Sequence, residues 1–476
     1  MRLSEISDET IGGDPKIMGL AADSRDVKDG YLFAALAGEN ADGAEFIPDA
    51  EKKGAAAVLA SKAGLSKLPT IVDKEPRKRL AKLAARFYGA QPRVCAGVTG
   101  TNGKTSTAVF AAQIWRALGE SAASIGTLGA SSGDINIPVR HTTPEPITLH
   151  KALAALAENG VEYAALEVSS HGLQQYRADG VQIKVAAFTN ITHDHLDYHD
   201  DFTAYRNAKA RLFESLLMED GAAVINADGA GAEYFKQIAN DRGVAIITTG
   251  VRGKTLRLVH VTPEAEGLRI EIKCDSESFR VRTPLIGAFQ AENALVAAGI
   301  VMASGYSADI VLPALNAIQS APGRMERVAS VRGGTVFVDY AHTPDAVATA
   351  LKALRPHVQG KLIAVIGAGG DRDKKKRPLM GAAAAANADI VIVTDDNPRR
   401  ENPAAIRRSV LAGAPDALEE GDRKRAILAG IENIRPGDAL LIAGKGHEHG
   451  QEVGDEILPF DDAQVVRELI AQYGGA

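Results

Sequence analysis

Short apolar runs alternate with polar turns and helix-forming stretches along the whole chain. From residue 94 onward the repeated order is strand, glycine-rich turn and helix. The runs at 164–168 and 185–191 have the form of buried strands that end in polar residues. This alternation is typical of a mostly parallel sheet flanked by helices. The pattern therefore predicts an α/β fold.

Two breaks divide this pattern into three parts. The first break is the segment 89–93, which ends a helical stretch. It leaves residues 1–92 as a small α/β unit. The second falls near 321–327 and separates 93–325 from 326–476. The last part holds four strand candidates, TVFVD, KLIAVIG, DIVIVTD and DALLIAG, each followed by a polar or glycine-containing loop. Because ligands collect at the carboxyl ends of strands in such sheets, we expect the chemistry in these loops.

Composition and charge narrow the possible functions without changing the predicted fold. Of 476 residues, 45% are apolar and 24% charged, which is typical of a globular protein and excludes a disordered one. A formal charge of −6 argues against a general nucleic-acid binder. The two cysteines, Cys95 and Cys274, are too few for a disulfide framework or a thiolate metal site. Since the chain also lacks a signal-peptide pattern and an apolar run near the roughly 18 residues of a membrane helix, we expect a cytoplasmic protein without membrane insertion.

The strongest local signal is GVTGTNGKTST at 97–107, between an apolar run and a helix-forming stretch. Backbone amides of a glycine-rich turn and of a helix N-terminus bind anions. Lys104 is placed to reach the terminal phosphates of a nucleotide, and the hydroxyl of Thr105 to ligate Mg²⁺. The strict phosphate-loop pattern fails, since Val98 stands where its first glycine belongs. A glycine-rich turn with a chance lysine is the alternative, but strand, loop and helix together favour ATP or GTP binding.

Acidic and histidine residues after two of the expected strands are candidates for a metal site. Glu167 ends one strand and is placed for a metal contact near the phosphate loop, although taken alone it is more simply a strand-end acid that faces solvent. The segment 189–199 carries three histidines and two aspartates. A transition-metal site and a polar surface loop both fit this segment, but a hard cation beside phosphate prefers oxygen ligands. We expect only His195 to reach the ion or its shell.

Lys209 is a candidate for a reactive amine. A helix is predicted over 203–218, with apolar residues at 212, 213, 216 and 217, and Lys209 lies one turn before Phe213 on the face that should be partly buried. A half-buried lysine is unprotonated often enough to react. From the sequence alone, a side chain that extends to solvent is the more common outcome.

One ordered set of motifs resembles the Mur ligases. In chain order the motifs are GTNGKT, EVSSHG, TNITHDHLDYH followed by Lys209, GRME, DYAHTPD, GDRD, DNPR and GKGHE, and they cover essentially the whole chain. GTNGKT alone would also fit folylpolyglutamate synthetases, whereas DSR near the N-terminus and DNPR near the C-terminus are similar to the members that add meso-2,6-diaminopimelate. A Mur ligase that adds another amino acid is the nearest alternative. A nucleotide-hydrolysing switch without ligase activity is the more distant one.

The resemblance implies a three-domain enzyme, with a UDP-binding domain at 1–92, a central P-loop ATPase domain at 93–325 and a Rossmann-like amino-acid-binding domain at 326–476. It implies that ATP, with Mg²⁺, phosphorylates the D-glutamate γ-carboxylate of UDP-N-acetylmuramoyl-L-alanyl-D-glutamate. The amine of meso-diaminopimelate attacks this acyl phosphate, and a tetrahedral intermediate releases phosphate. The product would be the tripeptide precursor of peptidoglycan, made from small-molecule substrates by a monomer.

The resemblance also assigns roles to individual residues. Lys104, Lys209 and His195 match catalytic positions, and Lys209 matches the lysine that the family carbamylates to N6-carboxylysine, which turns a cation into a ligand for a second Mg²⁺. Thr105, Glu167 and His195 match metal positions. The matched nucleotide positions are Gly100, Thr101, Asn102, Gly103, Lys104, Thr105, Ser106, Asn293, Arg324, Asp339 and His342. Those for the muramoyl-dipeptide are Ser24, Glu39, Asn40, Ala41, Thr142, Thr143, Ser169, Gln175 and Arg177.

A third set of positions matches the diaminopimelate pocket: Arg372, Asp396, Asn397, Pro398, Arg399, Gly444 and Glu448. Diaminopimelate differs from lysine by one extra carboxylate, which the planar guanidinium of Arg399 is suited to bind through two hydrogen bonds. Against lysine, Arg399 would be left unpaired, so lysine should be rejected. The alternative is a proline turn with solvated arginines, but GDRD and GKGHE end on the same side of the predicted sheet. One departure from the family stands at Gln290, where asparagine is common.

Overall fold

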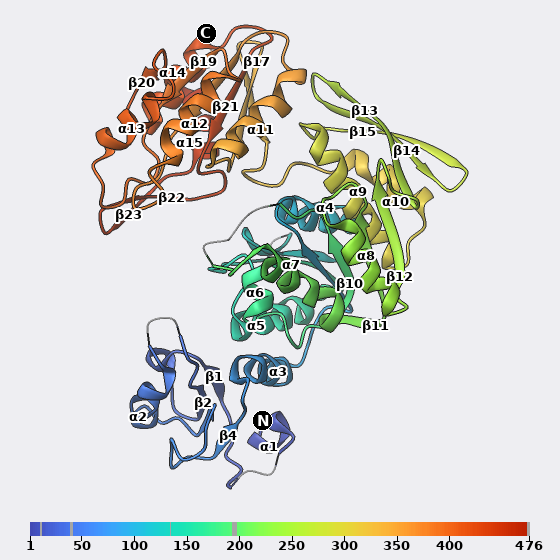
Figure 1. Cartoon of the computed structure of the whole chain (residues 1–476), viewed down its shortest axis with the longest axis vertical. Helices are drawn as coiled ribbons and strands as arrows, with labels where there is room; N and C mark the ends of the chain where they lie inside the picture. The colour runs from blue at the N-terminus through green and yellow to red at the C-terminus, as the bar shows by residue number, and fades with distance from the viewer. Residues whose placement is uncertain (10–11, 39–40, 134, 193–197, 474–476) are drawn as a thin grey trace. The chain divides into compact units, whose positions relative to one another are not determined.

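The computed structural model describes residues 1–9, 12–38, 41–133, 135–192 and 198–473. It forms two compact units, Met1–Arg257 with Leu295–Val311, and Leu258–Ala294 with Leu312–Ala476. Both units contain parallel strands connected by helices (Figure 1), which confirms the predicted α/β fold. The finer division into three domains stays a prediction. In the part of the chain that is described, no helix is long and apolar enough to cross a membrane.

The N-terminal part of the first unit is a parallel sheet of four strands in the order β1-β2-β3-β4. Its main elements are α1 (Leu3–Ser7), β1 (Gly19–Ala21), β2 (Tyr31–Ala34), α2 (Ile47–Lys52), β3 (Ala57–Ala60), β4 (Thr70–Val72) and α3 (Pro76–Tyr88). Successive residues of β2 point to opposite faces. Leu32 joins a core with Leu80 and Leu83 of α3, and Phe33 joins another with Ile47 of α2. Each face of this sheet is therefore covered by a different helix.

The central part of the first unit is a larger sheet with the strand order β12-β11-β10-β5-β9-β6-β7-β8. The strands from β12 to β6 run parallel, and β7 and β8 add antiparallel pairs at one edge. The carboxyl ends of the parallel strands therefore share one edge of the sheet, and the phosphate loop leaves β5 there. The elements are β5 (Val94–Thr99), α4 (Lys104–Ala117), β6 (Ala122–Gly126), β7 (Gly129–Ser132), β8 (Ile135–Ile137), α5 (Pro146–Glu158), β9 (Tyr163–Glu167), α6 (Ser170–Gln174), β10 (Ile183–Phe188), α7 (Phe202–Arg211), β11 (Leu217–Asn226), α8 (Ala232–Asp241) and β12 (Ala245–Gly250). Two further helices, α9 (Ala288–Ala303) and α10 (Ala308–Ala314), span the boundary of the units.

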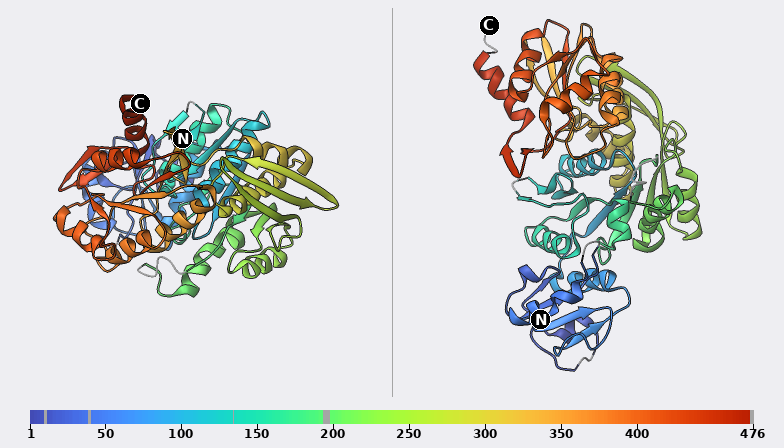
Figure 2. Two further views of the ribbon diagram at one scale, coloured as in Figure 1. Left: turned by 90° about the horizontal axis from the view of Figure 1, so that it is seen from above. Right: turned by 60° about the vertical axis from the view of Figure 1, so that its left-hand side comes forward.

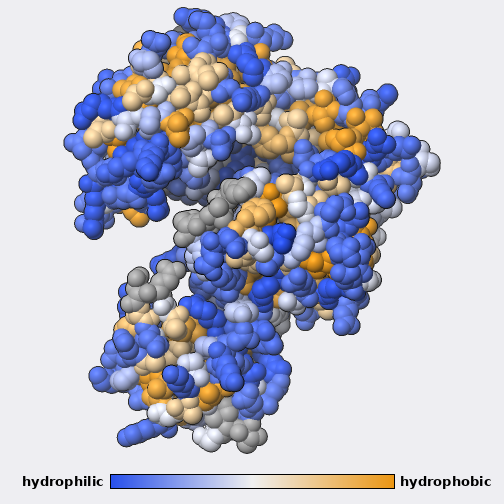
Figure 3. Space-filling model, viewed as in Figure 1, coloured by the Kyte–Doolittle hydropathy of each residue, from blue (hydrophilic) through white to orange (hydrophobic). Residues whose placement is uncertain are grey.

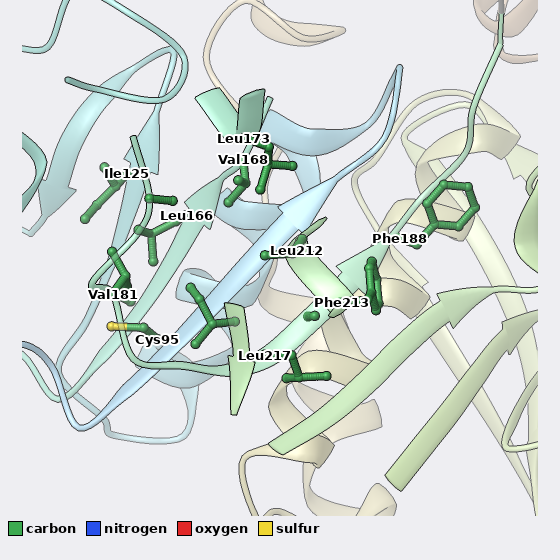
Figure 4. Close-up of a cluster of buried hydrophobic side chains, with 14 of the residues drawn as sticks. Cys95, Ile125, Leu166, Val168, Leu173, Val181, Phe188, Leu212, Phe213 and Leu217 are labelled. Carbon is green, nitrogen blue, oxygen red and sulfur yellow. The ribbon is translucent and has the colours of Figure 1, made fainter. Parts of the chain in front are cut away.

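A hydrophobic core covers one face of this central sheet. Side chains of β5, β9 and β10 meet Leu212 and Phe213 there (Figure 4). The rings of Phe188 and Phe235 stack with their centroids 4.0 Å apart and close the core toward α8. The strands predicted at 164–168 and 185–191 are β9 and β10, so their apolar character reflects this burial.

The sequence predicts one helix over 203–218, and this prediction is wrong. α7 ends at Arg211, a π-helical turn spans Leu212–Leu216, and β11 begins at Leu217. Leu217 pairs with Ile183 of β10, so the last apolar residues belong to the sheet. Apolar spacing could not separate these outcomes, because the start of a buried strand is as apolar as the buried face of a helix.

The second unit contains a sheet of six strands in the order β16-β17-β21-β18-β19-β20, with β16 antiparallel to β17 and the others parallel. The four predicted strands are β17 (Gly334–Asp339), β18 (Leu362–Ile366), β19 (Ile390–Val393) and β21 (Ala439–Ala443). Helices lie on both sides of this sheet (Figure 2). The remaining elements are β13 (Leu256–Glu264), which spans the boundary of the units, β14 (Gly267–Cys274), β15 (Glu277–Thr283), β16 (Glu326–Val331), α11 (Pro344–Leu354), α12 (Lys376–Ala385), α13 (Pro403–Leu411), β20 (Leu418–Glu419), α14 (Arg423–Asn433), β22 (Gly450–Val453), β23 (Glu456–Pro459) and α15 (Asp462–Tyr473).

Two separate cores stabilise this second sheet. Ala364 of β18 lies in one core with Leu351 of α11, whereas Ile363 lies in the other with Ile427 of α14 and Val466 of α15. The strands are therefore apolar on both faces, as is usual when helices cover a parallel sheet on both sides.

On the outer surface, hydrophobic residues are interrupted by hydrophilic ones on the face shown in Figure 3.

A fully buried ion pair joins the last helix of the second unit to its sheet. Arg423 begins α14 and Asp462 begins α15, and the Nη2 of Arg423 lies 2.7 Å from Oδ2 of Asp462, with both side chains 0% exposed. Arg423 also donates to the carbonyl oxygens of Ala443 (3.0 Å) and Asp395 (3.3 Å). These carbonyls stand at the ends of β21 and β19, so one guanidinium fixes two strand ends and α15.

Replacing Asp462 by alanine would leave the Arg423 guanidinium buried without its counter-charge. We expect the free energy of unfolding of the second unit to fall by about 3–5 kcal/mol. Scanning calorimetry of the full chain measures this loss as a lower transition temperature of that unit. Glu468→Ala is the control, because Glu468 pairs at 3.9 Å with Lys424 across the same two helices and both side chains are half-exposed. Equal stability of the two variants would contradict this role of the buried pair.

Candidate active site

The phosphate loop lies between the end of β5 and the first turn of α4. Gly100 has φ 151°, and a Cβ there would come within 2.0 Å of Oγ1 of Thr189, so only glycine fits. The loop is held in place by Asn190, whose carbonyl accepts from Thr101 N (2.8 Å) and whose Oδ1 accepts from Asn102 N (3.0 Å). Gly103 precedes the first turn of α4 and makes no side-chain cap hydrogen bond, and the amides of a helix N-terminus favour an anion.

Lys104 and Lys209 bring two amines to this loop from different elements. Nζ of Lys104 donates to the carbonyl oxygens of Gly100 (2.9 Å) and Thr101 (2.7 Å). Nζ of Lys209 donates to the same Gly100 oxygen at 2.8 Å and lies 4.6 Å from the ring centre of Tyr205, one turn earlier in α7. Lys209 is 1% exposed, so the solvent-exposed side chain favoured by the sequence alone is wrong. The loop carbonyl supplies the polar partner that makes this burial possible.

Glu167 lies next to the loop, and its carboxylate is buried rather than solvated. It is 3% exposed, and its Oε2 accepts from the hydroxyl of Thr105 at 2.8 Å. Its Oε1 accepts from the backbone N of Thr127 at 2.8 Å. A Cβ on Gly126 would come within 2.1 Å of that oxygen, so the glycine makes room for the carboxylate. The solvent-facing interpretation of Glu167 is therefore wrong.

The oxygen atoms of Thr105 and Glu167 suit a hard divalent cation such as Mg²⁺. Among the described residues, no group of three or more histidine, cysteine, aspartate or glutamate side chains is placed to hold a metal. A protein site with so few ligands fits an ion whose other ligands are phosphate oxygens and water, which is how Mg²⁺ usually binds. His195, the remaining predicted ligand, lies outside the described residues.

Four residues matched to the muramoyl-dipeptide form one hydrogen-bonded cluster beyond β9. Oγ1 of Thr143 lies 3.1 Å from Oγ of Ser169, and Arg177 donates to the carbonyl of Thr143 (3.0 Å) and to Oε1 of Gln175 (2.7 Å). Thr142 connects this cluster to the carboxylate region, because its hydroxyl lies 3.1 Å from that of Thr127. The structure thus places these positions close to Glu167.

The positions matched to the sugar-nucleotide end lie in the N-terminal part of the first unit. Ser24 begins a 3₁₀ turn, and its carbonyl accepts from Nζ of Lys53 at 2.9 Å. Ala41 is exposed at the edge of a described range, whereas Glu39 and Asn40 lie outside the described residues. The structure therefore brings no contacts to bear on the role of the stretch 39–41.

In the second unit, Arg324 and His342 lie against the ring of Tyr340. The guanidinium of Arg324 lies 4.5 Å from the ring centre. Asp339 accepts from the backbone N of Met325 (2.7 Å) and Ala341 (2.9 Å), and burial raises the pKa of its carboxyl. His342 packs edge-on against Tyr340 and contacts its carbonyl through Nδ1 at 2.8 Å. Tyr340 was not singled out by the sequence, although it lies inside the motif DYAHTPD.

Asn293 and Gln290 lie one turn apart on α9 and form a pair. Nδ2 of Asn293 donates to Oε1 of Gln290 at 3.0 Å, and both side chains are buried. Gln290 is the position where the chain departs from the family pattern. In this chain its amide oxygen supplies the acceptor for Asn293.

All the positions matched to diaminopimelate except Arg372 come from two strand-end loops of the second unit. Nδ2 of Asn397, after β19, donates to Oε2 of Glu448, after β21, at 2.9 Å. Asp396 packs against Gly444, where a Cβ would come within 2.4 Å of its Oδ2. Nη1 of Arg399 donates to the carbonyl of Gly370 at 2.9 Å. The structure therefore brings these five residues together.

The two remaining matched positions are Arg372 and Pro398. Arg372 is exposed, and Pro398 supplies a carbonyl that accepts from the N of Glu401 at 3.1 Å. The loop that carries Arg372 is fixed by Glu401, since the backbone N of Asp371 donates to its Oε1 at 2.7 Å. Hydrogen bonds from Arg377 lower the pKa of Glu401 to about 2, so Glu401 stays ionised at neutral pH.

Lys445 is a site residue that the sequence analysis missed. Its Nζ donates to Oδ1 of Asn397 (3.0 Å) and to Oε2 of Glu448 (3.2 Å), and its side chain is 0% exposed. The buried amine of Lys445 therefore contacts both Asn397 and Glu448. The sequence carried one local signal, since a Gly-Lys pair after an apolar strand also occurs in the phosphate loop at 103–104.

Three family models match successive parts of this chain. The model described as the Mur ligase family catalytic domain matches residues 16–88, the Mur ligase middle domain matches 98–301, and the Mur ligase glutamate ligase domain matches 323–446. Two solved structures are similar over nearly the whole length. A UDP-N-acetylmuramoyl-L-alanyl-D-glutamate–2,6-diaminopimelate ligase aligns with a TM-score of 0.75 at 34% identity and covers 100% of both chains. MurF ligase from Thermotoga maritima in complex with ADP aligns with a TM-score of 0.63 at 19% identity and covers 95% of this chain and 97% of its own.

Curated relatives are also similar along nearly their whole length. The UDP-N-acetylmuramoyl-L-alanyl-D-glutamate–2,6-diaminopimelate ligase of Caulobacter vibrioides is 48% identical over 470 residues, which is 97% of each chain. The protein of the same name from Bradyrhizobium diazoefficiens is 48% identical over 461 residues, covering 96% of this chain and 95% of its own. On the evidence of the matched domains and of these relatives, the chain belongs to the Mur ligase family.

Proposed function

We propose that this chain is an ATP-dependent ligase that adds meso-2,6-diaminopimelate to the D-glutamate γ-carboxylate of UDP-N-acetylmuramoyl-L-alanyl-D-glutamate. The products are the UDP-linked tripeptide of peptidoglycan synthesis, ADP and phosphate. The observation that carries the proposal is the similarity, at 48% identity over 97% of the chain, to a curated ligase of this name. The loops of the second unit support it, because they gather carboxylates and a guanidinium suited to a diamino dicarboxylic acid.

The first chemical requirement is activation of a carboxylate, which resists attack by amines until one oxygen becomes a good leaving group. The residues of the first unit fit this task. The amides at the start of α4 and the amine of Lys104 are placed to hold a triphosphate, and Thr143, Ser169 and Arg177 are placed to orient the acceptor substrate near Glu167. Catalysis of phosphoryl transfer consists mostly of positioning and charge stabilisation, which these groups supply.

Mg²⁺ is proposed as the metal at the phosphate loop. Thr105 and Glu167 would hold it, and the ion would neutralise the phosphate charge that develops during transfer. Lys209 is proposed to hold a second ion as a carbamate. In that modification the unprotonated amine attacks CO₂, a C–N bond forms, and one proton is released. Its burial supports this role, because burial disfavours the charged ammonium and so favours the unprotonated amine that reacts with CO₂.

The second requirement is recognition of the amine donor. Glu448 and Asp396 offer carboxylate oxygens to ammonium groups, and Lys445 holds Asn397 and Glu448 in register. Arg399 offers hydrogen-bond donors to a carboxylate at the far end of the substrate. These charges match a molecule with two ammonium and two carboxylate groups. Lysine would bring no second carboxylate to the guanidinium of Arg399.

We further propose that the enzyme acts as a monomer in the cytoplasm on these small molecules alone. Both cysteines are free and buried, which fits a reducing compartment.

The test of the proposed function is ADP formation with UDP-N-acetylmuramoyl-L-alanyl-D-glutamate and one candidate amino acid at a time. We expect turnover only when both substrates are present, with meso-diaminopimelate far better than L-lysine. Faster addition of L-lysine would instead indicate a Mur ligase of different specificity. Phosphate release that ignores the UDP-dipeptide would exclude ligase function.

Lys209→Ala should lower kcat by about a hundredfold or more, because it removes a group proposed to hold charge next to the phosphates. Added acetate should restore part of the activity if the native group is a carbamate. Lys236→Ala is the control, since Lys236 on α8 only pairs with Glu233 at the surface. Undiminished turnover of Lys209→Ala would refute the role, and the mass of the intact protein in bicarbonate reports the modification directly.

Arg399→Ala should raise the KM for meso-diaminopimelate by about a hundredfold, because a charged pair with two hydrogen bonds is lost. The KM values for ATP and for the UDP-dipeptide should not change. Arg400→Ala is the matched control, because the next arginine pairs with Asp455 and both side chains are largely exposed. A KM for diaminopimelate that matches the control would contradict the assignment of Arg399.

A further inference from the structure

The hairpin of β22 and β23 lies along the loop that carries Arg399. Nε2 of Gln451 donates to the carbonyl of Asp396 at 2.5 Å, and the backbone N of Glu452 donates to Oδ1 of Asn397 at 3.0 Å. The backbone N of Arg399 donates to the carbonyl of Glu452 at 3.0 Å, and the N of Gly454 donates to the carbonyl of Arg399 at 2.8 Å. Consecutive residues of the hairpin therefore contact consecutive residues of the loop, as in a short parallel ladder.

This ladder holds Arg399 in an unusual backbone conformation. Its φ is 50°, in the left-handed region that residues other than glycine rarely adopt. Such a conformation persists when surrounding contacts fix it, and the two backbone hydrogen bonds to the hairpin do so. The backbone of Arg399 is thus set by the hairpin, and the direction of its side chain follows.

The guanidinium itself is held on two of its nitrogens. Nε lies 2.6 Å from Oε2 of Glu452, and Nη1 donates to the carbonyl of Gly370 at 2.9 Å. The side chain is 22% exposed. A guanidinium carries five N–H donors in a fixed plane. With Nε occupied, the edge formed by Nη1 and Nη2 still has donors for a bidentate carboxylate.

We propose that Glu452 is a positioning residue for amino-acid selection, which turns the Nη1–Nη2 edge of Arg399 toward the far carboxylate of the diamino substrate. The inference rests on the proposed function and deepens it. The carboxylate of Glu452 fixes the rotation of the guanidinium by binding the one nitrogen that a substrate held end-on does not use. Arg399 is thereby ordered before the substrate arrives, so less conformational freedom is lost on binding.

The hairpin offers a built-in comparison. Asp455, in the turn between β22 and β23, pairs with Arg400 at 2.6 Å, and both side chains are largely exposed. Removing either acid deletes one ion pair between the same hairpin and the same loop. Of these two acids, Glu452 is the one that pairs with Arg399. Its side chain is also dispensable for the ladder, because the contacts of Glu452 to Asn397 and to the backbone of Arg399 use main-chain atoms.

The experiment compares Glu452→Ala, Glu452→Gln and Asp455→Asn with the full-length enzyme in steady-state assays. Glu452→Ala should raise the KM for meso-diaminopimelate about tenfold, as expected for loss of one close ion pair that orders the guanidinium, with kcat little changed. Glu452→Gln should restore only part of the KM, because its amide oxygen keeps the contact with Nε but not the charge. Asp455→Asn should behave as the wild type. In all variants the KM for the UDP-dipeptide and the melting temperature should stay the same.

A KM for meso-diaminopimelate in Glu452→Ala that stays within about twofold of Asp455→Asn would overturn the inference. A lower KM would overturn it as well, since it would show that Glu452 competes with the substrate for Arg399. Failure of the proposed function is distinguishable, because the wild-type enzyme would then not use meso-diaminopimelate at all, and the inference would fall with it.

Discussion

The sheet of the second unit depends on one buried guanidinium. Arg423 bonds to Asp462 and to two strand-end carbonyls, in a place where neither charge reaches water. Burial of an ion pair is costly, and the cost is offset only when every donor and acceptor is satisfied. Arg423 meets this condition by serving both strand ends at once. The loops after β19 and β21, which carry Asn397 and Glu448, therefore begin from fixed points.

In the phosphate loop, too, one group serves several partners. The carbonyl of Gly100 accepts from both Lys104 and Lys209, and the Thr189–Asn190 segment at the end of β10 fills the space that a side chain at Gly100 would need. In both units the strands supply apolar packing, while their carboxyl ends supply the polar groups. The chemistry is thus placed where the sheet no longer requires apolar residues.

Much of the fold was readable from the sequence. The strands β9, β10, β17, β18, β19 and β21 all match short apolar runs, because burial on both faces leaves a continuous apolar signal. The helix predicted over 203–218 was wrong in its last part, where strand pairing with β10 prevails over helical periodicity. The phosphate loop was equally readable, since its glycines and Lys-Thr pair are local features.

The state of individual side chains was much less predictable. Lys209 finds its acceptor on Gly100, 109 residues earlier in the chain, so no local pattern could indicate its burial. Glu167 is buried because Thr105 and Thr127 converge on it from other elements. Lys445 and Glu452 were missed for the same reason, since their partners Asn397 and Arg399 are distant in sequence. Pairings of this kind become visible only when the topology is known.

The π-helical turn after α7 constrains how the chain tolerates changes in length. It joins the helix that aims Lys209 at Gly100 to the strand that starts at Leu217. Adding or deleting one residue there would rotate the amine by about 100° around the helix or exchange the two sides of β11. The pairing of β10 with β11 skips residues between Leu217 and Ala222, which is a bulge that absorbs extra length. Insertions during evolution should therefore accumulate at the bulge and be excluded from the turn.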